Sequence, residues 1–267
     1  MTKRLDHLSP TSIAQFERCG HQWKLERMDK IPKMVGMPLV GGLAWHDVSK
    51  ENFLQKIETG NDLEEHELER LFKKFFQKRV DVAILHIPPG TPSLKDLIEE
   101  TRARLVRLVP AYVEYASTVM PIEGGVEKRF VIPGTDQYPD ILCYVDLIDD
   151  QRCVHDLKTT KSAWSDDDVA VDTQLSAYGL AYRIEFGQDP AGFSFDFLVA
   201  TKTTAKAIIK RTQRNASHYI TFLRRAAYVW KMHQAEIYPP ATKGWWCGAK
   251  YCCHTEHCEF FPKLRRV

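Results

Sequence analysis

Long apolar runs are missing from this 267-residue sequence, and their absence excludes several classes of protein. No stretch approaches the roughly 20 consecutive apolar residues that a membrane-spanning helix needs. The N-terminus has no positively charged segment followed by an apolar run and a small-residue cleavage site, so no secretory signal is visible. The sequence also has no internal repeat, no low-complexity segment and no P-loop. We therefore expect a cytoplasmic protein that has no membrane partner.

An excess of charge of one sign is also missing. The chain has 37 Lys and Arg residues against 35 Asp and Glu residues, for a formal net charge of +2. The overall charge neither requires nor excludes a nucleic-acid partner, so a local basic surface would have to attract one. The length and the hydrophobic fraction of 44% suit one large domain, or a domain with an insertion, that buries a sizeable core.

Hydrophobic periodicity divides the chain into three parts. Residues 1–120 are predicted to be helical, with Ser9 and Pro10 as typical first residues of a helix. Residues 121–236 are predicted to form an α/β core, and residues 237–267 an irregular, cysteine-rich tail. The elements expected within the first two parts are helices over 93–116, 172–186 and 212–236, and strands over 126–132, 139–148, 152–159, 192–200 and 206–211.

Two aspartates and a lysine on neighbouring strands provide the first chemical signal. Asp146 lies on a strand with period-2 alternation, and Asp156 and Lys158 are two apart on the next strand, so they share a face of the sheet. A hairpin would bring both carboxylates close enough to share one divalent cation. Paired carboxylates suit Mg²⁺ or Mn²⁺, and a lysine beside the metal could stabilise developing negative charge. The simpler alternative is an exposed ion pair on a surface hairpin.

Three further side chains strengthen the catalytic interpretation. Gln174 and Tyr178 are four apart on the helix that follows the second strand, so they share one helix face and can lean over the same site. Ordinary helix packing is the alternative for this pair. His46 could supply a nitrogen ligand from the helical N-terminal part, although a lone histidine on an amphipathic helix is more often structural.

Cysteines provide the second signal. Cys247, Cys252 and Cys258 lie in the short tail, and Cys19 lies far away in the first helical region. In a reducing compartment such a cluster favours metal binding over disulfides. Four thiolates could hold a [4Fe–4S] cluster or a tetrahedral Zn²⁺, and His254 and His257 keep a mixed zinc site open. Cys143 and Cys153 are predicted to be small buried hydrophobic residues within strands.

The order of these motifs resembles the PD-(D/E)XK nuclease signature of the RecB-like branch. The resemblance implies an α/β fold with a restriction-endonuclease-like core, a mixed central sheet flanked by helices. It implies that His46, Asp146, Asp156 and the Leu157 carbonyl ligate the metal, and that Lys158 is the catalytic lysine. In the same way, Gln174 and Tyr178 would position the substrate and Glu127 would be a further acidic residue. Asp156 in place of Glu departs from the commonest pattern of the family.

One N-terminal cysteine with three near the C-terminus resembles the iron–sulfur staple of AddB-type and CRISPR-associated RecB-like nucleases. By that resemblance Cys19, Cys247, Cys252 and Cys258 bind a [4Fe–4S] cluster that ties the first helix to the end of the chain. The Cys252–Cys253 doublet leaves the third ligand open, with Cys252 favoured by its spacing.

The resulting hypothesis is a metal-dependent DNA nuclease, an exonuclease on single strands or DNA ends that acts in recombination or repair. Because the sequence has no P-loop, a helicase or recombination protein would have to supply any unwinding. The alternatives are a catalytically silent DNA- or partner-binding module with the same fold, and a zinc-stapled enzyme that acts on a small phosphate ester. The intact Asp, Asp and Lys favour an active nuclease.

Overall fold

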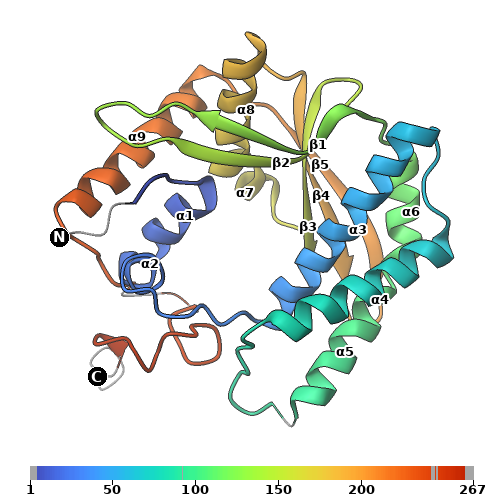
Figure 1. The fold of residues 1–267 in the computed structure, drawn as a ribbon, viewed down its shortest axis with the longest axis horizontal. Coiled ribbons are helices and arrows are strands. Elements are labelled where there is room, and N and C mark those ends of the chain that lie inside the picture. The colour runs from blue at the N-terminus through green and yellow to red at the C-terminus, as the bar shows by residue number, and fades with distance from the viewer. Residues whose placement is uncertain (1–4, 92, 242–243, 245, 262–267) are drawn as a thin grey trace.

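A mixed sheet forms the centre of the molecule (Figure 1). The computed structural model describes residues 5–91, 93–241, 244 and 246–261. In this part of the chain the sheet has five strands in the order β1-β2-β3-β4-β5, and only β3 and β4 run parallel. The strands are β1 (Pro121–Ile132), β2 (Ile141–Asp149), β3 (Cys153–Thr160), β4 (Gly192–Ala200) and β5 (Ala205–Thr212).

Helices cover both faces of this sheet (Figure 1). One group packs with the Phe-rich face of β4, and it comprises α1 (Pro10–Arg18), α2 (Gly20–Arg27), α7 (Asp166–Val171), α8 (Thr173–Phe186) and α9 (Ala216–Gln234). The second group packs on the other face and comprises α3 (Met37–Thr59), α4 (Glu65–Val82), α5 (Leu94–Val106) and α6 (Val109–Ser117). No helix in the described residues combines the length and apolar character needed to cross a membrane.

Local capping explains where several helices begin and end. Ser9 caps α1 by accepting a hydrogen bond from the Ser12 N–H, as its residue type predicts. The Asp172 carboxylate accepts hydrogen bonds from the first turn of α8. That helix ends at Gly187, whose φ of 71° lies in the left-handed region that glycine tolerates. The two ends of α8 are therefore encoded locally, which matters because α8 carries Gln174 and Tyr178.

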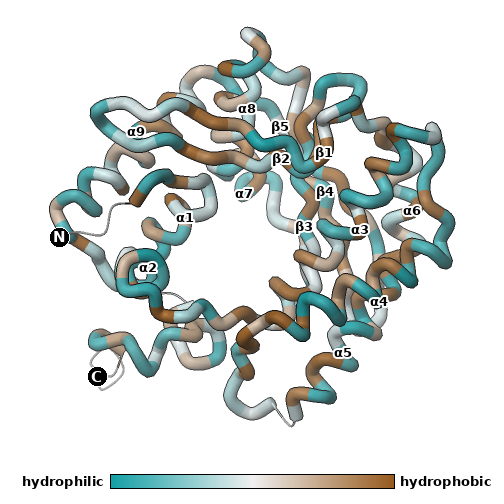
Figure 2. The backbone as a smooth tube through the Cα atoms, in the orientation of Figure 1, coloured by the Kyte–Doolittle hydropathy of each residue, from teal (hydrophilic) through white to brown (hydrophobic). Residues whose placement is uncertain are grey.

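Two apolar clusters hold the layers together. The cluster on the Phe-rich face buries Phe195 and Phe197 of β4 with Phe222 of α9. The other buries Trp45 of α3 with Phe72 of α4, whose rings stack at 5.2 Å. Figure 2 shows hydrophobic and hydrophilic segments alternating along the elements, as expected where each has one buried side.

Most predicted elements are present, and the differences have local causes. The helix predicted over 93–116 is two helices, α5 and α6, because Pro110 has no N–H to continue a helix and sits in the first turn of α6. Cys153, predicted to be buried, is only partly buried. The expected strands and their antiparallel β1-β2-β3 pairing are confirmed, as is the α/β class with an irregular C-terminal region. Residues 262–267 of the predicted tail lie outside the described part.

A pair of aromatic residues on α9 tests the first apolar cluster. Phe222 is fully buried, whereas Tyr228 on the same helix is 58% exposed. Phe222→Ala should lower the free energy of unfolding by about 3–5 kcal/mol, because it removes buried apolar surface and leaves a cavity. Tyr228→Ala makes a similar change in helix propensity and should cost less than about 1 kcal/mol. Urea denaturation of both variants measures the difference, and equal losses would contradict the packing described.

Candidate active site

The site begins where β2 and β3 separate. Their ladder contains only the pairs Leu147↔His155 and Ile148↔Val154. Beyond it, the Asp146 carboxylate accepts a hydrogen bond of 2.8 Å from the Leu157 N–H and so occupies the gap between the strands. This contact fixes the orientation of the Leu157 peptide relative to Asp146, two of the positions predicted to ligate metal.

Asp156 and Lys158 form a buried ion pair on β3. The Lys158 Nζ lies 2.6 Å from Asp156 Oδ2, and the Asp156 side chain is 1% exposed. Apart from this ionic contact, both Asp156 oxygens are buried without a hydrogen-bond partner of good geometry. Burying a carboxylate in this way is costly, so its oxygens are suited to a cation that would complete their coordination.

Gln174 and Tyr178 approach the same lysine from α8. The Lys158 ammonium donates to Gln174 Oε1 at 3.0 Å, and the Gln174 amide donates to the Tyr178 hydroxyl at 2.6 Å. The lysine also lies over the Phe195 ring, 5.7 Å from its centroid. Lys158 is therefore held from several sides, which restricts where its ammonium can point.

His46 and Glu127 join Asp146 from two other elements. Nδ1 of His46 lies 3.4 Å from Asp146 Oδ1. One ligand atom from each of His46, Glu127 and Asp146 lies within 4.8 Å of the others. Glu127 sits after an irregularity in β1, and its φ of 48° is uncommon for a residue with a side chain. Such strained positions concentrate at functional sites. The structure thus brings this distant glutamate to the two residues predicted as metal ligands.

The electrostatics of the site are dominated by burial and close opposite charges. Burial raises the pKa of Asp156 to about 7, against the opposing effect of Lys158. For Asp146 burial is outweighed by His46 and Lys158, which together lower the pKa of its carboxyl. Burial alone would lower the pKa of His46, yet Asp146 raises it to about 9. In the absence of metal, charges of the protein therefore compensate one another in this site.

The residues present fit a divalent cation. Carboxylate oxygens of Asp146 and Asp156, a histidine nitrogen and a backbone carbonyl are donors that Mg²⁺ or Mn²⁺ accepts. The buried Asp156 oxygens support this fit best, because apart from the ion pair with Lys158 they have no hydrogen-bond partner of good geometry. Asp156 lies outside the group of His46, Glu127 and Asp146 whose ligand atoms are within 4.8 Å of one another. Glu127 offers a further carboxylate on the side of His46.

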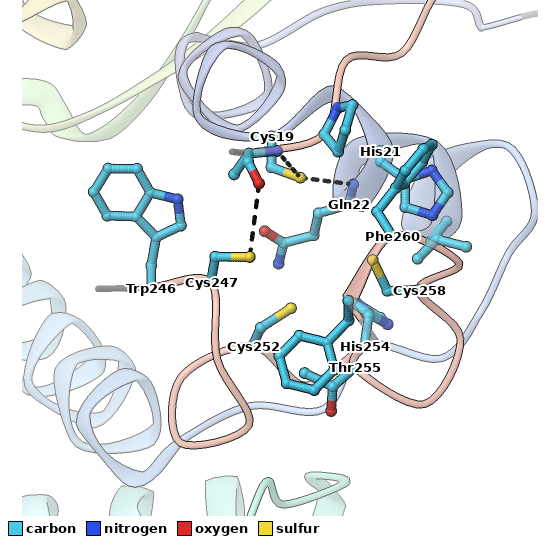
Figure 3. Close-up of a pocket in the computed structure, with 14 residues that line it drawn as sticks. Cys19, His21, Gln22, Trp246, Cys247, Cys252, His254, Thr255, Cys258 and Phe260 are labelled. Atoms are coloured by element: carbon cyan, nitrogen blue, oxygen red, sulfur yellow. Dashed lines mark hydrogen bonds between the residues drawn. The ribbon is translucent and has the colours of Figure 1, made fainter. Parts of the chain in front are cut away.

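A second cluster lies between α2 and the C-terminal segment. Cys19, Cys247, Cys252 and Cys258 line one cavity, and Figure 3 shows them around a common space together with Gln22. The Cys19 sulfur accepts hydrogen bonds from the N–H groups of Gln22 and Ala241, at 3.4 and 3.3 Å. Two segments more than 200 residues apart in sequence therefore supply the four predicted cysteines to one place.

Cys253 belongs to a different group. It does not line the cavity of the other four cysteines, and its sulfur lies instead near Glu26 and His254. His254 is buried and pairs with Glu26 through Nε2 at 2.9 Å. Within the described residues, this group and the His46 group are those whose ligand atoms lie within 4.8 Å of one another; the four cavity cysteines are spaced more widely.

A buried polar network beside the site was not predicted from the sequence. His155, next to Asp156, contacts Asp149 of β2 and Asp196 of β4. Asp149 lies one residue beyond the strand predicted over 139–148, and its buried carboxylate accepts a hydrogen bond from the Cys153 N–H. A signal was present, since Ser194 and Asp196 alternate with three phenylalanines on an otherwise apolar strand.

Comparison with known protein families identifies the chain. A family model described as the PD-(D/E)XK nuclease superfamily matches residues 7–259. The chain belongs to this superfamily. It is therefore a nuclease of the PD-(D/E)XK type, whose members generally use divalent metals and bind nucleic acid, and the restriction-endonuclease-like core expected from the sequence is confirmed. No curated protein matches the chain.

One solved structure shares the fold of this chain. A "Putative exonuclease" from Eubacterium rectale superimposes with a TM-score of 0.52 and 14% identity, over 98% of this chain and 89% of that one. The structure of SSO0001 aligns with a TM-score of 0.36 and 10% identity, over 94% and 95% of the two chains. At 14% identity, the likeness to the Eubacterium rectale structure supports the fold alone.

The buried ion pair of Asp156 with Lys158 leads to a stability prediction. In metal-free protein, Asp156→Asn should lower the free energy of unfolding by about 3–5 kcal/mol, because it leaves the Lys158 ammonium buried without the carboxylate that lies 2.6 Å from it. Asp166→Asn is the matched control and should cost less than about 1 kcal/mol, because the Asp166 side chain that pairs with Lys210 is 93% exposed. Urea unfolding with a chelator measures both, and equal losses in the two variants would contradict the prediction.

Proposed function

We propose that this PD-(D/E)XK nuclease is a Mg²⁺- or Mn²⁺-dependent deoxyribonuclease, an exonuclease that acts on single-stranded DNA or DNA ends. The observation that carries the proposal is the close grouping of His46, Glu127 and Asp146, with the buried Asp156–Lys158 pair on the adjacent strand. The intact Asp146, Asp156 and Lys158 argue against a catalytically silent binding module. The family membership supports nuclease activity itself.

Hydrolysis would proceed by in-line attack of water on the phosphorus, with a new P–O bond forming as the bond to the leaving oxygen breaks. A divalent cation, when bound by His46, Asp146, Asp156 and the Leu157 carbonyl, supplies positive charge for the transition state and lowers the pKa of water. Lys158 holds a proton, since Asp156 and Asp146 outweigh burial and raise the pKa of its ammonium. It therefore acts as a hydrogen-bond donor that orients the attacking water or stabilises developing negative charge.

Gln174 and Tyr178 would set the direction of that donor. Gln174 Oε1 accepts from Lys158, while its amide nitrogen donates to Tyr178, so the amide cannot flip without losing a contact. Glu127 would take part from the opposite side, near His46. With these roles, the substrate phosphate would lie between β3 and α3.

A large basic cavity supports DNA as the substrate. Its volume is about 650 Å³, and its lining includes one carboxylate, Glu100, and five cationic side chains: Arg18, Lys33, Arg104, Lys161 and Lys250. Lys161 directly follows β3, three residues beyond Lys158. Trp246 and Tyr251 also line the cavity. Cations that track a phosphate backbone together with aromatic rings that stack bases are typical of single-strand binding.

Lysine substitution tests the reaction. Lys158→Ala should lower the cleavage rate by about 10²–10³-fold, because it removes the positioned donor at the reacting phosphate. The assay follows 5′- and 3′-labelled DNA, linear and circular, single- and double-stranded, with Mg²⁺ or Mn²⁺. Lys231→Ala, at an exposed position of α9, is the matched control and should leave the rate unchanged.

Robust metal-dependent cleavage by Lys158→Ala would overturn the assignment. Degradation of circular single strands at the same rate as linear ones would contradict exonuclease action, since a circle offers no end. Because the 267 residues contain no P-loop, we propose that a helicase or recombination protein supplies any unwinding, in DNA recombination or repair.

We further propose that Cys19, Cys247, Cys252 and Cys258 bind a [4Fe–4S] cluster. The cluster would link the tail, residues 237–267, to the helical part, residues 1–120. Both parts would flank the nuclease core, residues 121–236. A single tetrahedral Zn²⁺ with bonds of about 2.3 Å would need its sulfurs within about 4 Å of one another. The wider spacing of these sulfurs and the N–H donors on Cys19 favour a cluster, with Zn²⁺ as the alternative.

Cysteine variants separate these ligands. Cys258→Ser should abolish the brown colour and the absorbance near ~400 nm of anaerobically purified protein, whereas Cys253→Ser should keep both, because Cys253 does not line the cavity. Metal analysis should find about four irons per chain in the wild type. Colourless protein with one zinc per chain would overturn the cluster assignment, and loss of iron in Cys253→Ser would overturn the choice of ligands.

A further inference from the structure

Four buried side chains form a polar network alongside the candidate site. Nδ1 of His155 lies 2.8 Å from Asp196 Oδ2, and its Nε2 lies 3.1 Å from Asp149 Oδ2. The Tyr115 hydroxyl donates to the same Asp196 oxygen at 2.7 Å. We name Asp149, His155, Asp196 and Tyr115 the polar clamp. It joins β2, β3, β4 and α6 through side chains that are at most 8% exposed.

The polar clamp lies on the other side of β3 from Asp156. Adjacent residues of a strand project to opposite faces, so His155 points toward α6 while Asp156 points toward the Phe-rich face. The clamp borders a cavity of about 240 Å³ that Arg211 and Gln213 also line. Each member bonds at least one other member of the clamp, and Asp196 also accepts a hydrogen bond from the Ser194 hydroxyl at 2.5 Å.

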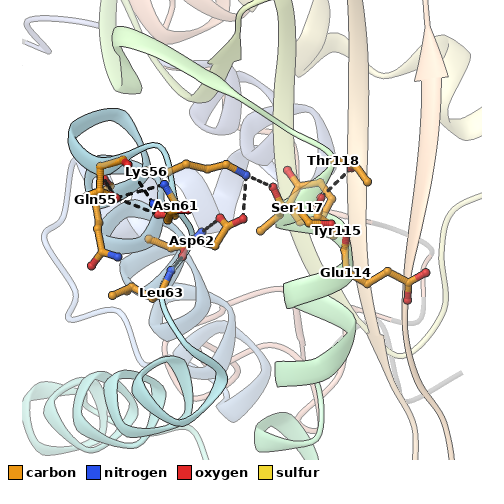
Figure 4. A network of polar contacts seen from close by, with 12 residues as sticks. Gln55, Lys56, Asn61, Asp62, Leu63, Glu114, Tyr115, Ser117 and Thr118 are labelled. Atoms are coloured by element: carbon orange, nitrogen blue, oxygen red, sulfur yellow. Dashed lines mark hydrogen bonds and ion pairs between the residues drawn. The ribbon is translucent and has the colours of Figure 1, made fainter.

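Each element of the metal site connects to this clamp. His155 directly precedes Asp156 on β3, and Asp149 follows Asp146 by three residues on β2. The third connection runs through α6, where the residue after Tyr115 accepts a hydrogen bond at 2.6 Å from Lys56 of α3. Figure 4 shows Lys56 extending toward α6 while it also pairs with Asp62 at 2.8 Å. Helix α3 carries His46, so all three ligand-bearing elements are linked.

The clamp matters because the backbone ladder alone is weak here. β2 and β3 share only two residue pairs, whereas β3 and β4 share eight. The separation between the Asp146 and Asp156 carboxylates therefore depends on side chains that cross from β2 to β3. His155 makes such a contact through Asp149, and Asp196 holds the other ring nitrogen against β4.

We propose that His155 is a positioning residue, which sets the geometry of the metal site through the polar clamp without touching substrate or metal. The proposal rests on the proposed function, because it assumes that Asp146 and Asp156 bind a divalent cation. Side chains that orient ligands from outside the coordination sphere commonly change metal affinity by 10–100-fold when they are removed.

Calorimetric titration with Mn²⁺ tests this role without DNA turnover. His155→Ala should weaken Mn²⁺ binding by about tenfold and raise the half-saturating Mn²⁺ concentration for cleavage by a similar factor. At saturating Mn²⁺, kcat should recover toward the wild-type value. Tyr115→Phe removes a single hydroxyl from the clamp, and it should cause a smaller shift in the same direction in a protein that keeps its fold.

Gln213→Ala is the matched control, since Gln213 lines the same cavity but bonds the Ala191 carbonyl outside the clamp. Its Mn²⁺ affinity should equal that of the wild type. Unchanged affinity in both folded clamp variants, judged by circular dichroism, would overturn the proposal, as would a fall in kcat that saturating Mn²⁺ does not reverse. A wild type that binds Mn²⁺ but cleaves no DNA would contradict the proposed function, while the affinities would still decide the role of His155.

Discussion

The geometry of the candidate site depends on how soon β2 and β3 separate. Two residue pairs hold the strands together, and beyond them the Asp146 carboxylate replaces the ladder by accepting the Leu157 N–H. A longer ladder would satisfy that N–H with a backbone carbonyl and leave Asp146 without its position between the strands. The separation therefore creates the place where carboxylates from both strands can meet, and it also leaves that place dependent on surrounding contacts.

Those contacts come from opposite sides of the sheet. On one side, Lys158 lies over the Phe195 ring of β4, and α8 supplies Gln174. On the other side, α3 carries His46, which lies beside Asp146. The same helix is joined to α6 by the hydrogen bond from Lys56 to a backbone carbonyl of α6. Apolar packing holds the layers, whereas buried polar contacts fix the relative positions of individual strands. Asp156 and Lys158 are too buried to be fully hydrated, so the charged form of each is stabilised mainly by the other.

The cysteine cavity adds a second long-range connection. It joins α2 to the C-terminal segment, and Cys252 and Trp246 line both this cavity and the basic one. The C-terminal segment therefore contributes residues to the cavity that is proposed to receive DNA.

Local patterns were sufficient to predict much of this molecule. Period-2 alternation located β2 and β3, helix spacing paired Gln174 with Tyr178, and the capping signal at Ser9 located the start of α1, because each depends on residues a few positions apart. The order of Asp146, Asp156 and Lys158 likewise carried the resemblance to a nuclease. Only the tertiary structure revealed the strained Glu127 beside His46, the different environment of Cys253 and the polar clamp around His155. These features join residues far apart in sequence, and their energies come from burial and charge compensation that exist only once the layers have packed.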